Sequence, residues 1–205
     1  MWFPMFPLGR VLFPTQVLPL RVFEPRYLEM IERCTAGDPR FGVVLIERGS
    51  EVGGGDERFG LGTAASIVGT SELDDRTLAV ITVGGPRVRV TRWLPDDPYP
   101  RAEVEFLGEP AGDGAPRALR RVLGEFARVR ALASELGMES GLDTSAAEAG
   151  GDAAVISHRL AALAPVGPLD AQELLEAADA AGRLDLLAAK LDEVATLLEM
   201  RLALD

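Results

Sequence analysis

The sequence predicts an α+β protein, with a closed or half-closed β-sheet over residues 1–110 and a helical bundle over residues 111–205. Up to about Pro110, short β-branched or alternating runs are separated by Gly, Pro or Asp pairs, which is typical of strands. Beyond the turn-rich stretch EPAGDGAPR (109–117), apolar residues recur at spacings of three and four, the period of an amphipathic helix. The change of period therefore predicts a sheet subdomain followed by a helical subdomain.

Five runs in the first part have the composition and alternation of strands. They are FGVVLI (41–46), GTAASIVG (62–69), TLAVITV (77–83), RVRVTRW (87–93) and AEVEFL (102–107). In the last run the apolar side chains share one face, and Glu103 and Glu105 share the other. We expect Arg87 and Arg89, on a neighbouring strand, to pair with these two glutamates.

Four segments in the second part have helical spacing. They run from about residue 117 to Gly137, from Ala153 to Ala164, from Asp170 to Ala180, and from Leu184 to Leu202. Asp170 and Glu173 form a D-x-x-E pattern, which indicates the capped start of the third of these helices.

The segment RVFEPRY (21–27) places charged residues among apolar ones and predicts a junction between a strand and a short helix at 25–36. Pro25 suits the first turn of a helix, where its missing N–H is not needed, and Gly37 closes the helix. Glu24 is placed to accept hydrogen bonds from the first free N–H groups. Arg21 and Arg26 are close enough in sequence to pair with Glu24 or with loop carbonyls, and Tyr27 faces inward. We interpret all five junction residues, from Arg21 to Tyr27, as architecture.

Composition excludes several classes of function. The net charge of −11 argues against nucleic acid or an anionic membrane as a partner, because phosphate binding needs clustered cations. Cys34 is the only cysteine, which excludes an internal disulfide and a cysteine metal cage. The proline-broken N-terminus is not typical of a secretory signal, and no later run reaches the length of a membrane span. We expect a cytoplasmic protein with no cofactor and no bound metal.

The run PMFPLGRVLFPTQVLPLRVFEPRYLEMIERC (4–34) resembles the start of the Lon protease substrate-binding domain. This family also occurs as a free-standing bacterial protein and as the Lon-like part of cereblon. Later stretches match in order, including RFGVV (40–44), TLAVITVGGPRVRV (77–90) and PYPRAEVEFL (98–107). The resemblance implies a six-stranded PUA-like β pseudo-barrel followed by a C-terminal helical bundle. It does not imply catalysis, because the ATPase and Ser-Lys protease activities of Lon belong to other domains.

The residues agree with a non-catalytic chain. No Walker motif is present, and the sole lysine, Lys190, falls in a leucine-periodic helix where Asp192 or Glu193 can pair with it. We expect His158, the only histidine, at the surface or at the edge of the bundle. Cys34 is predicted to be a small buried hydrophobe, since no histidine lies near it in sequence to activate it.

The resemblance favours a module that binds protein or peptide segments, either unfolded clients or a separate protease. Partners would bury apolar surface in a groove between barrel and bundle, or add a strand at an open sheet edge. The candidate contacts are apolar residues expected in loops, with two arginines as a polar rim: Trp2, Phe59, Leu61, Trp93 and Tyr99, with Arg58 and Arg92.

Two other classes of function are alternatives. One is a peptidase-like hydrolase, because the family is associated with proteolysis. The other is an RNA-binding protein, since PUA domains bind RNA, although the acidic balance of this chain weighs against it.

Overall fold

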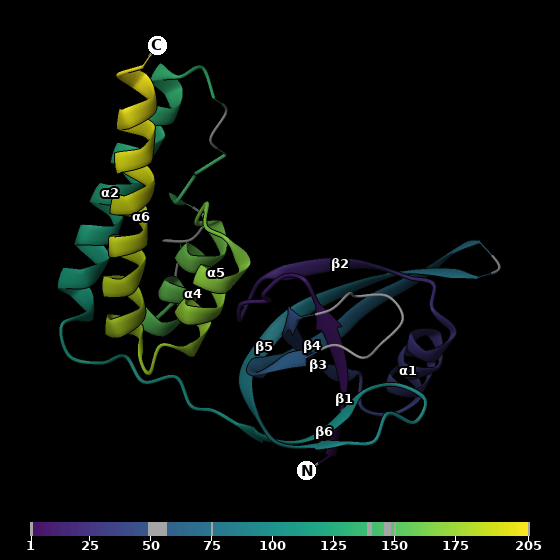
Figure 1. The fold of residues 1–205 in the computed structure, drawn as a ribbon. Helices are drawn as coiled ribbons and strands as arrows, with labels where there is room; N and C mark the ends of the chain where they lie inside the picture. The colour runs from purple at the N-terminus through teal and green to yellow at the C-terminus, as the bar shows by residue number, and fades with distance from the viewer. Residues whose placement is uncertain are drawn as a thin grey trace. The chain divides into compact units, whose positions relative to one another are not determined.

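The computed structural model describes residues 2–48, 57–74, 76–138, 141–145, 149 and 151–204. The chain divides into two compact units, Met1–Gly108 and Glu109–Asp205, and each is described by itself (Figure 1). The sheet unit contains β1 (Trp2–Leu8), β2 (Val17–Val22), α1 (Pro25–Ala36), β3 (Arg40–Arg48), β4 (Glu57–Asp74), β5 (Thr77–Leu94) and β6 (Arg101–Phe106). The helical unit contains α2 (Ala115–Glu135), α4 (Ala153–Leu163), α5 (Pro168–Glu176) and α6 (Ala180–Leu202). The predicted α+β class is confirmed.

The sheet unit has the strand order β2-β5-β4-β3-β1-β6, and β6 also pairs with β5. β1 and β3 are parallel, and the other pairs are antiparallel. Five strands therefore form a closed ring of pairings, and β2 is attached to this ring only through β5. The other edge of β2 carries no strand among the residues that the structure describes.

β5 is one continuous strand of 18 residues, so the prediction of two separate strands at 77–83 and 87–93 was wrong. The glycines between these runs serve close packing rather than a turn. A Cβ on Gly84 would lie 2.1 Å from the carbonyl oxygen of Phe13. The segment before β2 runs against this point, where Thr15 N donates to Gly84 O at 2.7 Å.

The salt bridges between β5 and β6 follow the strand register. Arg89 pairs with Glu105 as predicted, with Nη1 and Oε1 2.6 Å apart. Arg92, rather than Arg87, lies opposite Glu103, because the register shifts between Val90 and Arg92. Arg87 is buried and donates to the carbonyl oxygen of Gly108 at 3.4 Å.

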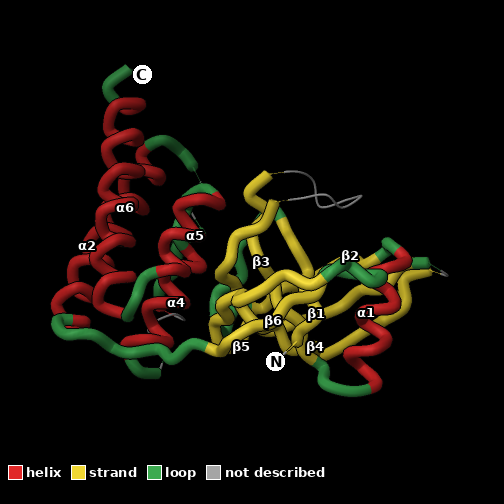
Figure 2. Tube along the Cα trace, turned by 60° about the horizontal axis from the view of Figure 1, so that its bottom comes forward, coloured by secondary structure: helices red, strands yellow, loops and turns green. Residues whose placement is uncertain are grey.

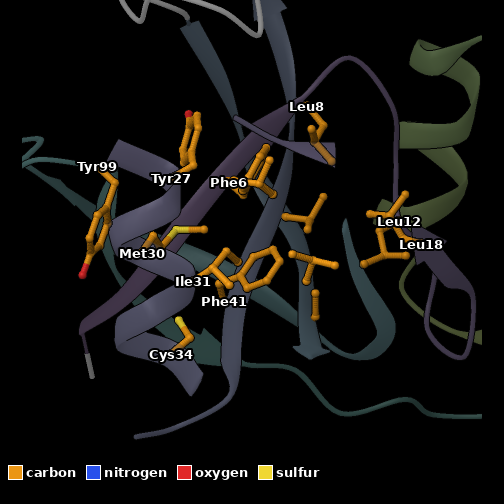
Figure 3. Packing of buried hydrophobic residues seen from close by; sticks show 14 residues of the cluster. Phe6, Leu8, Leu12, Leu18, Tyr27, Met30, Ile31, Cys34, Phe41 and Tyr99 are labelled. Carbon is orange, nitrogen blue, oxygen red and sulfur yellow. The ribbon is translucent and has the colours of Figure 1, made fainter. Parts of the chain in front are cut away.

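The core of the sheet unit lies between α1 and the strands, as Figure 3 shows. α1 begins at Pro25 and ends at Ala36, which confirms the predicted helix. It buries four side chains at helical spacing, namely Tyr27, Met30, Ile31 and Cys34. A second cluster in the same unit contains Phe3, Met5, Val44, Ala64, Val88, Ala102 and Val104.

In the helical unit, α2 and α6 lie side by side (Figures 1 and 2), and each buries an apolar stripe against its neighbours. α5 begins at Pro168 with Gly167 as its N-cap, so Asp170 does not cap it. The D-x-x-E spacing instead puts two carboxylates on one helix face. The carboxylates of Asp170 and Glu173 lie 2.5 and 2.8 Å from Lys190 Nζ of α6. Lys190 therefore pairs with α5 and not with Asp192 or Glu193, as the sequence had suggested.

A polar cluster lies inside the helical unit. His158 is 1% exposed, so the expectation of a surface or edge position was wrong. Its Nε2 lies 2.9 Å from Glu109 Oε2. Arg183 is fully buried, and it donates to Ser157 Oγ at 2.9 Å and to Leu174 O at 3.0 Å. Oxygens from α4 and α5, together with Glu109 Oε2 at 3.5 Å, thus surround one guanidinium, as a buried cation requires.

Within the described part of the chain, no helix is long and apolar enough to cross a membrane. The same residues contain no group of three or more His, Cys, Asp or Glu side chains placed to hold a metal ion.

Candidate functional site

A pocket of about 210 Å³ lies along β2. We name it the edge pocket; its lining residues are Phe6, Leu8, Arg10, Leu18, Pro19, Leu20, Arg21, Val22, Phe23, Glu24 and Tyr27. Seven consecutive residues, 18–24, contribute to it. Successive side chains of a strand point to opposite faces of the sheet. Because side chains from both faces of β2 line this pocket, it opens at the edge of the strand.

The sequence of β2 suits an edge strand. Proline has no N–H to donate to a ladder, which confines it within sheets to edges, first residues or bulges. Pro19 lies within β2, opposite Ile81 of β5. The edge of β2 that does not face β5 is the one where backbone groups remain available to a further strand.

The apolar wall of the edge pocket comes from β1 and α1. The rings of Phe6 and Tyr27 stack with centroids 4.2 Å apart and an interplanar angle of 20°. Figure 3 shows the two rings facing each other beside Met30. Both side chains are buried, so this wall is held by the core of the sheet unit rather than by a loop.

The rim of the edge pocket is charged. Arg10 and Arg21 line the pocket and are exposed. Among the residues that the structure describes, neither guanidinium forms an ion pair. Glu24 is the acidic residue of the lining, and its Oε2 accepts from Arg26 Nε at 3.2 Å.

Glu24 occupies the N-cap position of α1, but its side chain makes no capping hydrogen bond, contrary to expectation. Its backbone carbonyl accepts from Tyr27 N and Leu28 N, each at 3.0 Å. Its carboxylate pairs with Arg26, whose guanidinium lies 4.5 Å from the centroid of the Tyr27 ring. The predicted pairing of Arg26 with Glu24 therefore forms, while Arg21 stays outside it.

Apolar side chains are also exposed beside the edge pocket. Val17 is 59% exposed, Phe23 is 52% exposed, and Ile81 of the paired strand is 39% exposed. Large apolar side chains gathered next to an open strand edge are typical of a surface that binds other chains.

Two of the contacts predicted from the sequence do not lie on the surface. Tyr99 is fully buried, and Arg33 Nη1 donates to its hydroxyl at 3.4 Å. Leu61 is 8% exposed and lies inside β4. Tyr99 does lie in the loop between β5 and β6, as the sequence indicated, but it packs into the core of the sheet unit, whereas Leu61 lies in a strand. Both residues are therefore corrected to core.

Trp2 is 48% exposed, as a contact residue requires. It lines a second pocket, of about 340 Å³, together with Tyr99, Cys34 and Arg33. Burial, with a smaller contribution from Asp38, raises the pKa of the Cys34 thiol to about 11. This pocket therefore holds an unreactive thiol, which agrees with the prediction of a small buried hydrophobe.

The other predicted contacts lie on β4 and β5, and two of them, Arg58 and Trp93, are in contact. The Arg58 guanidinium lies 4.9 Å from the centroid of the Trp93 ring and 3.2 Å from Asp96 Oδ2. Phe59 and Trp93 are half-buried in strands rather than in loops. Arg92 pairs with Glu103. Both predicted rim arginines are thus engaged within the fold, and none of these residues lines the edge pocket.

Sequence reasoning missed Arg10, Val17 and Phe23 as candidate contacts. A signal was present, because alternation in VLPLRV places Val17, Pro19 and Arg21 on the face opposite the leucines. The proline marks this strand as an edge. The run of residues 17–22 is short and lies in a proline-rich segment, so its alternation was not recognised as that of a strand.

The fold and the site together define a protein of the α+β class, with a ring of paired strands, an open edge strand and a separate helical unit. The model of the ATP-dependent protease La (LON) substrate-binding domain matches residues 2–193. The chain belongs to this family.

Curated relatives match over nearly the whole of this chain. Lon protease 2 of Herpetosiphon aurantiacus is 28% identical over 203 residues, which cover 96% of this chain and 24% of the relative. Lon protease of Koribacter versatilis is 31% identical, over 89% of this chain and 23% of the relative. The chain therefore spans about a quarter of the length of these relatives.

Two solved structures share the fold. The Lon N-terminal domain protein from Xanthomonas campestris has a TM-score of 0.66 and 27% identity, covering 92% of this chain and 98% of that one. The N-terminal domain of Mycobacterium avium complex Lon protease has a TM-score of 0.66 and 14% identity, covering 94% and 99% of the two chains.

Proposed function

We propose that this chain is a non-catalytic module that binds polypeptide segments in extended form, with the edge pocket as the contact site. The observation that carries the proposal is the open edge of β2 with an apolar pocket along it. Membership of the LON substrate-binding family supports a role in binding substrates.

The size of the pocket favours a side chain over a small-molecule ligand. Pockets for small molecules and cofactors typically have volumes of about 300–1,000 Å³. The edge pocket, at about 210 Å³, is smaller and suits one or two apolar side chains.

An extended segment satisfies two requirements at once. Its backbone donates to and accepts from the open edge of β2, and its alternate side chains enter the pocket. Main-chain pairing does not depend on the sequence of the segment, whereas the pocket requires apolar side chains. Such segments are exposed in unfolded chains and buried in folded ones, so we propose unfolded polypeptides as the clients.

The test compares a permanently unfolded, alkylated protein with its native form as ligands, using fluorescence anisotropy. The unfolded form should bind and the native form should not. Val17→Asp and Phe23→Asp should each weaken binding about tenfold, because each places a charge beside the apolar site. Both side chains are more than half exposed, so the melting temperature should stay within a few degrees.

Leu197→Asp is the matched control, since Leu197 is 66% exposed on α6 in the helical unit. It should leave binding unchanged. Equal loss in all three variants, or equal binding of native and unfolded ligand, would rule out the edge pocket as the client site.

A further inference from the structure

We infer that the edge pocket selects segments in which an acidic residue lies between apolar ones, with Arg10 and Arg21 as receptors for the carboxylate. This inference rests on the proposed function, because it assumes that the ligand is an extended polypeptide. It adds the chemical class of the preferred segment, which neither the family nor the relatives specify.

The charge at the pocket differs from that of the rest of the chain. The chain has a net charge of −11, and many arginines of the sheet unit are occupied by carboxylates. Arg40 pairs with Asp38 at 2.7 Å, Arg89 with Glu105 at 2.6 Å and Arg92 with Glu103 at 2.6 Å. Within the described ranges, Arg10 and Arg21 have no such partner and line the same pocket.

The acidic residue of the lining does not cancel this charge. Glu24 is paired with Arg26, and both side chains are 18% exposed. The Arg26 guanidinium is further held over the Tyr27 ring. Two guanidinium groups therefore remain available to an anion at the rim, beside the apolar wall of Phe6 and Tyr27.

Strand geometry gives the order of side chains in the ligand. Leu18 and Val22 of β2 are buried, and Leu20 is half-buried. Arg21, which lies between Leu20 and Val22, is exposed. Residues directly opposite each other on antiparallel strands have Cβ atoms about 4.5–5.5 Å apart and point to the same face. A segment that pairs with β2 therefore presents apolar side chains opposite Leu20 and Val22, and the residue between them opposite Arg21. A carboxylate at that residue reaches the guanidinium, which binds carboxylates in a fork geometry.

The experiment uses labelled, end-capped peptides that differ only at a central triplet: Leu-Asp-Leu, Leu-Asn-Leu, Leu-Lys-Leu and Ser-Asp-Ser. Affinity for the full chain is measured by fluorescence anisotropy at low and at high salt. We expect Leu-Asp-Leu to bind about three- to tenfold more tightly than Leu-Asn-Leu at low salt, the range for one or two exposed charge pairs. Leu-Lys-Leu should bind most weakly of the three leucine peptides, and salt should reduce the differences.

The double variant Arg10→Gln/Arg21→Gln should bind Leu-Asp-Leu and Leu-Asn-Leu equally. Arg89→Gln, which removes one charge from an exposed pair on β5, should keep the preference. Arg21→Glu should shift the preference toward Leu-Lys-Leu. Circular dichroism of each variant checks the fold, and the peptide series on the unmodified chain does not depend on any variant.

The outcomes separate the two proposals. Equal binding of the Asp and Asn peptides, or a preference that survives in the double variant, would overturn the carboxylate inference while leaving the proposed function in place. Binding of Ser-Asp-Ser as tight as that of Leu-Asp-Leu would contradict an apolar pocket, and with it the proposed function. Failure of every peptide to bind would overturn both.

Discussion

Phe6 of β1 and Tyr27 of α1 stack with ring centroids 4.2 Å apart. The contact joins the first strand to the first helix and forms the wall of the edge pocket. The site therefore depends on the core, and a change in that core affects stability and binding together.

The first prediction concerns this stacked pair. Phe6→Ala should lower the free energy of unfolding by about 3–5 kcal/mol, because it removes a buried aromatic side chain and leaves a cavity. Urea denaturation measures the loss. Phe23→Ala is the control: Phe23 also lines the pocket but is 52% exposed, so its loss should stay below about 0.5 kcal/mol. Similar losses in the two variants would contradict the assigned burial.

The second prediction concerns Glu24. Because its carboxylate does not cap α1, Glu24→Ala should cost only the ion pair with Arg26, about 1 kcal/mol. A double-mutant cycle of Glu24→Gln and Arg26→Gln should give a coupling energy of about 0.5–1 kcal/mol. A coupling energy near zero would show that the pair contributes nothing. A loss of about 2 kcal/mol or more in Glu24→Ala would indicate that the side chain also caps the helix.

The third prediction concerns pH and Cys34. The pKa of the thiol is raised from its ordinary value near 9 to about 11, so the folded state binds this proton more tightly than the unfolded state. The resulting stabilisation, on the order of 2–3 kcal/mol, is complete below about pH 9 and is lost as the pH rises through 11. Comparing urea denaturation of the unmodified chain and Cys34→Ala from pH 8 to 11 isolates this contribution. Parallel curves would refute it.

The fourth prediction concerns Arg183. Arg183→Lys should destabilise the helical unit by about 3–5 kcal/mol, because an ammonium group cannot reproduce the contacts of a buried guanidinium. Far-UV circular dichroism during urea denaturation follows the helical signal. Arg121→Lys, at an exposed position 3.9 Å from Asp185, should change stability by less than about 0.5 kcal/mol. Equal effects of the two changes would disprove the special role of Arg183.

Part of the candidate site was predictable from sequence. The period-two pattern of residues 17–22 and the proline within them indicate an edge strand, and Pro25 marks the start of α1. The pocket itself was not predictable, because its other wall comes from Phe6 on β1, which meets Tyr27 only in the folded chain. Arg10 and Arg21 became candidates only when the structure showed which arginines already have carboxylate partners.

The sequence by itself determined the α+β class, the bounds of α1 and the resemblance to the LON family, because periodicity, prolines and glycines act on the chain locally. The tertiary structure decided which polar groups are buried and which strand edge stays open. His158 lies inside the helical unit because Glu109, 49 residues away, meets its ring. Tyr99 is core because it packs in a cluster with residues distant in sequence, such as Phe6 and Tyr27, and Arg33, 66 residues away, donates to its hydroxyl. Burial and charge pairing depend on such long-range contacts, which local patterns do not specify.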